Sequence, residues 1–214
     1  MDQHERQKTL PGNRSRPRAR AACAGWLRAL GLLATIVAVA SLAALVPRSV
    51  AGQTSEGLVS REYPLKAAYL YNFANYVEWP ASAFPTADAP FTIGVLGSDP
   101  FGAILDEVAA TKKVRDRRIV VLRFAHADQV KDCQILFIAD SVSKSQRAVA
   151  MARLVNLPVL VICDSGAENG PGEVIHFVTE NNRIRFTVNA ALAKQADLRI
   201  SSKILALAKT VSGR

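Results

Sequence analysis

The stretch Tyr63–Pro80 reads YPLKAAYLYNFANYVEWP and predicts a helix of about four turns. Pro64 fits the first turn of a helix and Pro80 cannot continue one, so the two prolines bracket it. Apolar residues at three- and four-residue spacing predict a face that packs on a core: Leu65, Ala68, Tyr69, Phe73, Tyr76 and Val77. We therefore expect a core helix that buries many aromatic side chains.

A second row of residues on this helix lies off the apolar face and is expected to be more exposed to solvent: Tyr71, Asn75 and Glu78. Tyr71 and Trp79 stand at the edge of the buried face. Side chains at such an edge can pack on the core and also contact a partner. We interpret Tyr71, Glu78 and Trp79 as candidates for a partner-binding surface.

Uninterrupted apolar runs follow the helix, and such runs are typical of strands buried on both faces of a parallel sheet. They predict four strands, over residues 91–96, 118–124, 134–139 and 159–163. Helical segments alternate with these strands, over residues 101–110, 125–131 and 141–154. This alternation indicates an α/β domain.

The pattern changes near residue 174. Two apolar segments, 174–178 and 184–188, flank a polar turn with Asn181 and Asn182, and asparagine tolerates positive φ, which predicts an antiparallel hairpin. Three short segments complete the chain: a helix over 190–196, an extended piece over 198–200 and a helix over 203–210. The predicted fold class is α/β, a single domain with a mainly parallel sheet flanked by helices and an added C-terminal antiparallel hairpin.

The N-terminal region has the features of an export signal. Residues 14–28 are basic, residues 29–46 form an apolar run without charges, and Ser49-Val50-Ala51 is a small-residue cleavage context. We expect a signal peptide over 1–51, a polar linker over 52–62 and the α/β domain over 63–210, in the periplasm. The length of the apolar run leaves an uncleaved membrane anchor as the alternative.

The net charge of +9 does not indicate a nucleic-acid partner. Residues 1–51 hold eight Lys/Arg and two Asp/Glu, so +6 of the total lies in the leader and +3 in the rest. The remaining basic cluster is short and has no interleaved aromatic residues: Lys112, Lys113, Arg115, Arg117 and Arg118. A solvated loop is favoured there over a polyanion site.

No catalytic, metal or cofactor motif emerges. The glycines of the turn 94–102 do not have the spacing of a dinucleotide or P-loop motif, which favours a simple chain reversal. Ser141 and Lys144 match S-x-x-K of penicillin-recognising enzymes, but the required K-T-G strand is absent, so Ser141 is interpreted as a helix cap. His126 and His176 are isolated and have no metal-ligand spacing.

Three carboxylates follow the carboxyl ends of predicted strands, which is the edge where α/β proteins bind ligands: Asp99, Asp140 and Asp164. Together they could hold a cation or a cationic ligand. Each could equally cap the helix or turn that follows it. They carry the alternative prediction of a periplasmic small-ligand-binding domain.

The mature chain has two cysteines, and no disulfide is expected between them. Cys133 opens one predicted strand and Cys163 closes the next parallel one. Opposite ends of neighbouring strands lie about 15–20 Å apart, whereas a disulfide needs Cα atoms within about 7 Å. We expect two buried, reduced thiols.

Three separated segments resemble the YfiR-like family. Lys66–Phe73 with Tyr76–Pro80 is similar to its opening signature, and Ile93–Gly97 with Asp99–Gly102 to its first strand and turn. The closing block is matched by Ile175–Val178, Asn182–Phe186, Asn189 and Leu198–Leu205. The resemblance covers about Tyr63 to Lys209, nearly the whole predicted mature chain.

The resemblance implies a periplasmic α/β domain without enzymatic activity or cofactor. The best-known member of the family binds the periplasmic sensor region of a membrane GGDEF diguanylate cyclase and represses it, which lowers cyclic-di-GMP and restrains biofilm formation. A membrane sensor of this kind is therefore the expected partner, and a homodimer stays open. The family repressor has two cysteine pairs where this chain keeps Cys133 and Cys163 alone, so the resemblance gives no basis for redox control here.

Overall fold

Within the residues that the structure describes, eight strands form one sheet in the order β10-β8-β7-β6-β5-β2-β4-β3. The computed structural model describes residues 56–164 and 172–213, and their side chains from residue 61 onward. The predicted signal peptide and its cleavage site lie outside this range. The strands are β2 (Phe91–Leu96), β3 (Lys113–Val114), β4 (Arg117–Phe124), β5 (Ile135–Ile138), β6 (Leu160–Cys163), β7 (Ile175–Glu180), β8 (Arg183–Asn189) and β10 (Thr210–Ser212).

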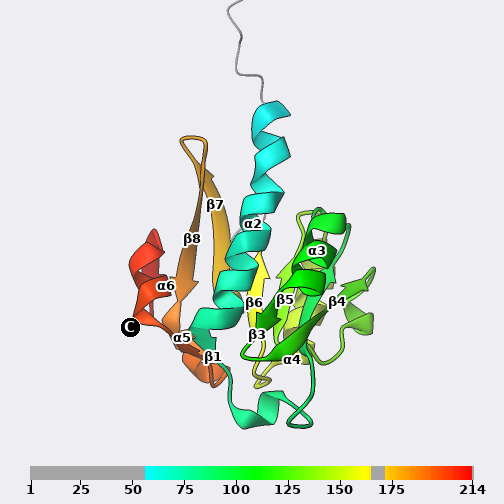
Figure 1. Ribbon diagram of the computed structural model, residues 1–214. Coiled ribbons are helices and arrows are strands. Elements are labelled where there is room, and N and C mark those ends of the chain that lie inside the picture. Colours follow the sequence, from blue (N-terminus) through cyan, green and yellow to red (C-terminus); the bar gives the residue numbers. More distant parts are fainter. Residues whose placement is uncertain (1–55, 165–171, 214) are drawn as a thin grey trace, which may run out of the picture. The chain divides into compact units, whose positions relative to one another are not determined.

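The centre of the sheet is parallel, as the apolar runs predict. Strand β2 pairs in parallel with both β4 and β5, and β5–β6 and β6–β7 continue the parallel arrangement. Every residue of β2, β5 and β6 is buried, because helices cover both faces of this part of the sheet (Figure 1). The predicted α/β class with a mainly parallel sheet is confirmed.

The added hairpin is also confirmed. Strands β7 and β8 pair antiparallel around Asn181 and Asn182, whose φ values of 48° and 65° are the left-handed geometry that a tight hairpin turn requires. The prediction is wrong at the C-terminus, where a helix was expected to reach Thr210. Helix α6 (Ser202–Leu207) ends earlier, and the chain adds β10 to the edge of the sheet, parallel to β8.

Two hydrophobic layers enclose the sheet. One layer is formed with α2 (Glu56–Tyr76), α3 (Ala103–Thr111), α5 (Ala190–Gln195) and α6. The other is formed with α4 (Lys144–Leu154) and the short 3-10 helix η2 (Ala127–Gln129). Figure 1 shows α2 and α3 in front of the sheet, with α2 crossing β6 and β7.

The predicted start and end of the first helix both need correction. Helix α2 runs from Glu56 to Tyr76, so Pro64 lies inside it and much of the predicted linker is helical. The chain after Tyr76 forms β1 (Val77–Glu78), which pairs with β9 (Arg199–Ile200), and then the 3-10 helix η1 (Ala81–Ala83). An ion pair between Glu62 and Lys66 spans the position of the proline and helps the helix to continue through it.

The turn before α4 shows why Ser141 is not its cap. Ser143 is the N-cap, and its hydroxyl accepts a hydrogen bond from the Gln146 amide at 3.3 Å. The Ser141 hydroxyl instead accepts from the Ser98 amide at 2.9 Å and so ties two loops together. Gly97 has a φ of 94° there, and a Cβ at this position would come within 2.7 Å of the Ser141 hydroxyl. The glycine turn therefore serves chain reversal and close packing.

Candidate functional site at the first helix and the strand ends

Helix α2 carries an aromatic cluster into the core. The Phe73 ring meets the edge of Phe186 with 5.1 Å between centroids, and Tyr69 and Phe177 lie against the same ring. The residues of the buried face are at most 1% exposed: Ala67, Leu70, Phe73, Ala74 and Val77. The prediction of a core helix with many aromatic side chains is confirmed.

The predicted orientation of this helix is wrong at three of the six positions assigned to its buried face. Leu65 is 44% exposed, Tyr76 is 39% exposed, and Ala68 is exposed as well. The residue that explains the rotation is Lys66, whose side chain is completely buried. A hydrophobicity pattern assigns lysine to solvent. The face predicted to be buried is therefore rotated about the helix axis relative to the face that the structure buries.

Lys66 is buried with charged partners at the carboxyl end of β6. Its ammonium pairs with Asp164, which is also fully buried, and with Glu62 one turn earlier on α2. The Tyr63 hydroxyl donates to the other Asp164 oxygen at 3.2 Å. This network fixes α2 to the strand end, because a buried charge is stable only when paired and hydrogen-bonded.

Tyr63 completes the enclosure of the lysine. Its ring lies 4.8 Å from the Lys66 ammonium and meets the Phe101 ring edge-on at 5.7 Å. Burial, followed by the nearby Asp164 carboxylate, raises the pKa of Tyr63 well above its ordinary value. The phenol therefore stays a neutral hydrogen-bond donor at physiological pH.

The three predicted ligand carboxylates share one edge of the sheet, because β2, β5 and β6 are neighbours and run in parallel. Asp99 accepts from the Arg123 guanidinium at 2.6 Å and from the Phe101 amide at 2.7 Å. Asp164 holds Lys66, whereas Asp140 is exposed. Asp99 and Asp164 thus bind cations of the chain itself.

The three predicted partner-binding residues lie along the end of α2 and in β1. Glu78 is exposed, whereas Tyr71 and Trp79 are half-buried. The Tyr71 hydroxyl donates to the Lys113 carbonyl at 3.3 Å. The Trp79 indole donates to the Gln134 carbonyl at 3.2 Å, and its ring packs edge-on against Phe91 at 5.0 Å. Both aromatic residues therefore have structural contacts, and part of each side chain is left at the surface.

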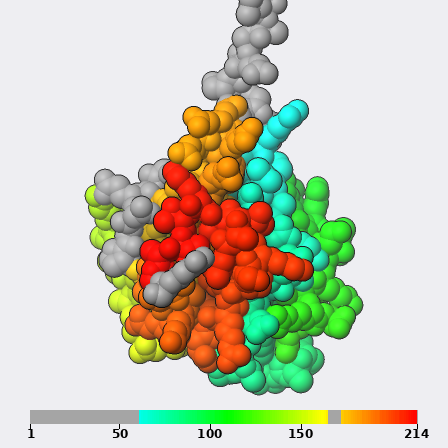
Figure 2. Space-filling view, turned by 90° about the vertical axis from the view of Figure 1, so that its left-hand side faces the viewer, coloured from blue at the N-terminus to red at the C-terminus, as the bar shows by residue number. Residues whose placement is uncertain are grey.

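The structure adds a surface that the sequence pattern did not separate from the core. We call it the outer face of α2: Leu65, Ala68 and Tyr76. Helix α6 packs beside it, with the Lys203 ammonium 5.3 Å from the Tyr76 ring and Leu207 60% exposed. Figure 2 shows α2 next to the C-terminal elements on this side of the molecule. The sequence does contain a signal for this surface, because α2 has more apolar residues than one buried face can accommodate.

Some of the other charged groups singled out in the sequence have structural contacts. His176 is buried, and its Nδ1 lies 2.9 Å from Glu173, which also pairs with Arg147. In the basic cluster, the Arg117 guanidinium stacks on the Phe84 ring at 4.0 Å, and Arg115 donates to a backbone carbonyl. Among the described residues, no group of three or more His, Cys, Asp or Glu side chains could hold a metal ion.

Comparison with known protein families matches residues 63–209 to a family model described as YfiR/HmsC-like. The match covers more than half of the chain and coincides with the range of the resemblance. The chain belongs to the YfiR/HmsC-like family. Membership indicates a periplasmic, non-enzymatic regulator of cyclic-di-GMP signalling. No curated protein matches this YfiR/HmsC-like chain. Over the described range, the structure contains no helix with both the length and the apolar character needed to cross a membrane.

The two cysteines of this YfiR/HmsC-like domain are buried and free in the structure. Cys163 pairs in register with Ile138, whereas Cys133 lies before the start of β5. This separation corresponds to about 16 Å along the strand at roughly 3.3 Å per residue. Burial, with a smaller contribution from Asp132, raises the pKa of Cys133 to about 12, and burial also raises the pKa of Cys163.

We expect two free thiols that react slowly in the native protein. A rise in the Cys133 pKa from 9.0 to about 12 lowers its thiolate fraction about a thousandfold, since each unit is a factor of ten. Exported protein prepared without reductant should give two thiols per chain with Ellman's reagent in urea and almost none in buffer. A value near zero in urea would show a disulfide and contradict this expectation.

Proposed function

We propose that this protein binds the periplasmic sensor region of a membrane signalling protein, and that the target is a GGDEF diguanylate cyclase which it represses. Family membership supports the cyclic-di-GMP pathway. The observation that carries the binding role is the outer face of α2, where a helix fixed to the core exposes Leu65 and Tyr76. Exposed aromatic and aliphatic side chains on a rigid element are typical of protein interfaces.

The binding surface extends from the outer face of α2 to Tyr71, Glu78 and Trp79. The network of Lys66 and Asp164 holds the helix rigidly on the sheet, so its surface is ordered before it meets a partner. Preorganisation of this kind lowers the entropy loss on binding. The half-buried rings of Tyr71 and Trp79 supply apolar area at the rim, and Glu78 supplies a charge.

Repression needs no chemistry on this chain. A sensor with two conformations is regulated when this protein binds one of them more tightly than the other. A difference in binding free energy of about 5.5 kcal/mol shifts such a sensor from 99% in one state to 99% in the other. The polar groups buried in this domain therefore serve its rigidity, and the regulatory step takes place in the partner.

Measuring cyclic-di-GMP in cells tests this proposal. Deletion of the gene should raise cyclic-di-GMP, and complementation with the wild-type chain should restore the lower level. Complementation with Trp79→Ala should fail in part, provided that immunoblots show equal amounts of exported protein. Unchanged cyclic-di-GMP after deletion, in cells that normally contain the protein, would exclude repression of a diguanylate cyclase.

A further inference from the structure

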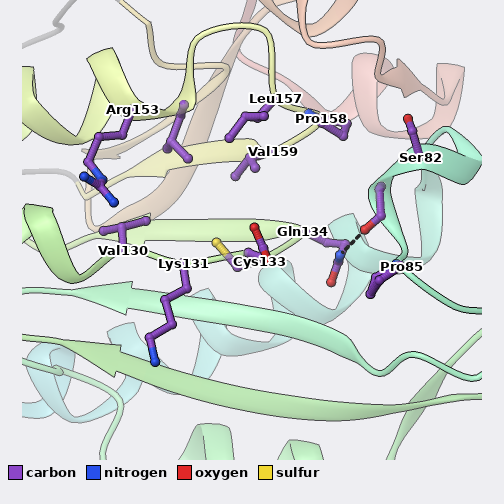
Figure 3. A pocket seen from close by; sticks show the side chains of 13 residues that line it. Ser82, Pro85, Val130, Lys131, Cys133, Gln134, Arg153, Leu157, Pro158 and Val159 are labelled. Atoms are coloured by element: carbon purple, nitrogen blue, oxygen red, sulfur yellow. Dashed lines mark hydrogen bonds between the residues drawn. The ribbon is translucent and has the colours of Figure 1, made fainter.

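A hollow lies away from the outer face of α2, at the amino ends of β5 and β6. Its volume is about 550 Å³, within the range of sites for small organic ligands. It is bounded by η1, by the chain before β5 and by the connection from α4 to β6 (Figure 3). We call it the basal pocket.

Apolar groups form about half of the wall of the basal pocket. Val130 and Val159 are buried wall residues, Cys133 presents its thiol beside them, and Leu157 and Pro158 form one side (Figure 3). Leu157 is 44% exposed although it faces this hollow. An apolar group placed here would bury surface that is now in water, which is favourable.

One end of the basal pocket is cationic. Arg153 and Lys131 lie at the left of Figure 3, opposite Ser82 and Pro85. Within the described residues, neither cation makes an ion pair, and Asp132 is the single carboxylate in the lining. The lining therefore has an excess of one positive charge.

We propose that the basal pocket binds a small amphipathic organic anion, such as a carboxylate with an apolar chain or ring. The carboxylate contacts Arg153 and Lys131, and the apolar part lies against Val130, Val159 and Leu157. Charge-assisted hydrogen bonds fix one end of such a ligand, and apolar contact supplies affinity along the rest. This site goes beyond the proposed partner binding and does not depend on it.

The floor of the basal pocket is connected to Trp79. Gln134 is buried, and its side-chain amide donates to the Ala83 carbonyl at 2.6 Å and accepts from the Thr92 amide at 2.7 Å. The backbone carbonyl of the same residue accepts from the Trp79 indole at 3.2 Å. A ligand on this floor changes the surroundings of Trp79, so its fluorescence reports on occupancy.

Titration with sodium octanoate, followed by tryptophan fluorescence, tests the site. Trp26 lies in the predicted signal peptide, so Trp79 is the one tryptophan expected in the mature chain, and Trp79→Phe gives the background signal. We expect a saturable change at about millimolar octanoate, which suits a ligand of this size. 1-Octanol has a chain of the same length without the charge. Its concentration should have to be at least about tenfold higher to give the same fluorescence change.

Variants of matched charge separate the pocket from general anion binding. Lys131→Gln with Arg153→Gln should raise the half-saturating octanoate concentration at least about tenfold. Lys112→Gln with Arg118→Gln removes the same charge from an exposed region outside the pocket. This double variant should leave the half-saturating octanoate concentration unchanged. The absence of saturation, or equal effects of the two double variants, would overturn the proposal. Both results come from purified protein without a partner, so they leave the regulatory role untouched.

Discussion

Replacing Lys66 with methionine should lower the free energy of unfolding by about 3–5 kcal/mol, because it removes the buried ammonium that pairs with the fully buried Asp164 carboxylate. A domain of this size loses about 2–4 °C in melting temperature per kcal/mol, so the expected drop is about 6–20 °C. Urea unfolding followed by circular dichroism measures the change. Asp164→Leu should have a similar effect, since it removes the buried carboxylate that pairs with the Lys66 ammonium.

The double variant decides whether these residues act as a pair. Lys66→Met with Asp164→Leu replaces both charges by apolar groups of similar volume, and such replacements are often neutral or stabilising. We therefore expect the double variant to be at least about 2 kcal/mol more stable than either single variant. A double variant that loses the sum of the two single effects would show that the two charges do not stabilise each other.

Leu65→Asp should weaken binding to the sensor region at least about thirtyfold, which corresponds to the 2 kcal/mol of an interface hot spot. The side chain is 44% exposed on the outer face of α2, so the substitution should change the stability of the domain by less than about 1 kcal/mol. Tyr76→Asp, on the same face, should have an effect of similar size. Surface plasmon resonance with the immobilised sensor region measures both.

Val149→Asp is the matched control for the outer face of α2. Val149 is also 44% exposed and also lies on a helix, but α4 belongs to the hydrophobic layer on the opposite side of the sheet. The Val149→Asp variant should bind the sensor region with the affinity of the wild type. Equal weakening by Leu65→Asp and Val149→Asp would place the contact elsewhere or indicate a general effect of an added charge.

The sequence predicted the sheet well because its signal is simple. Strands β2, β5 and β6 are buried on both faces, so each is an uninterrupted apolar run that hydrophobicity alone detects. The hairpin was visible from Asn181 and Asn182, which adopt positive φ in the turn. Strand β10 gave no such signal, because it is three residues long and only partly buried at the sheet edge.

The candidate site was harder to predict, because its main feature depends on tertiary contacts. Lys66 is buried only because Asp164, 98 positions later, comes to lie beside it, and nothing in the local sequence shows this. The position of Lys66 in turn sets which face of α2 is exposed, so Leu65 and Tyr76 were assigned to the core. Pro64 was taken as a helix start because one contact that holds the helix beside it, from Tyr63 to Asp164, is also distant in sequence.

Site-specific photo-crosslinking from the outer face of α2 tests the central claim most directly. Tyr76 is replaced by p-benzoylphenylalanine, which keeps an aromatic ring at that position, and Val149 is replaced in a parallel strain. After irradiation of intact cells, position 76 should form an adduct with a membrane protein that has a periplasmic region and a GGDEF domain, and position 149 should not. Adducts with such a protein from position 149 alone, or from neither position, would contradict regulation through the first helix.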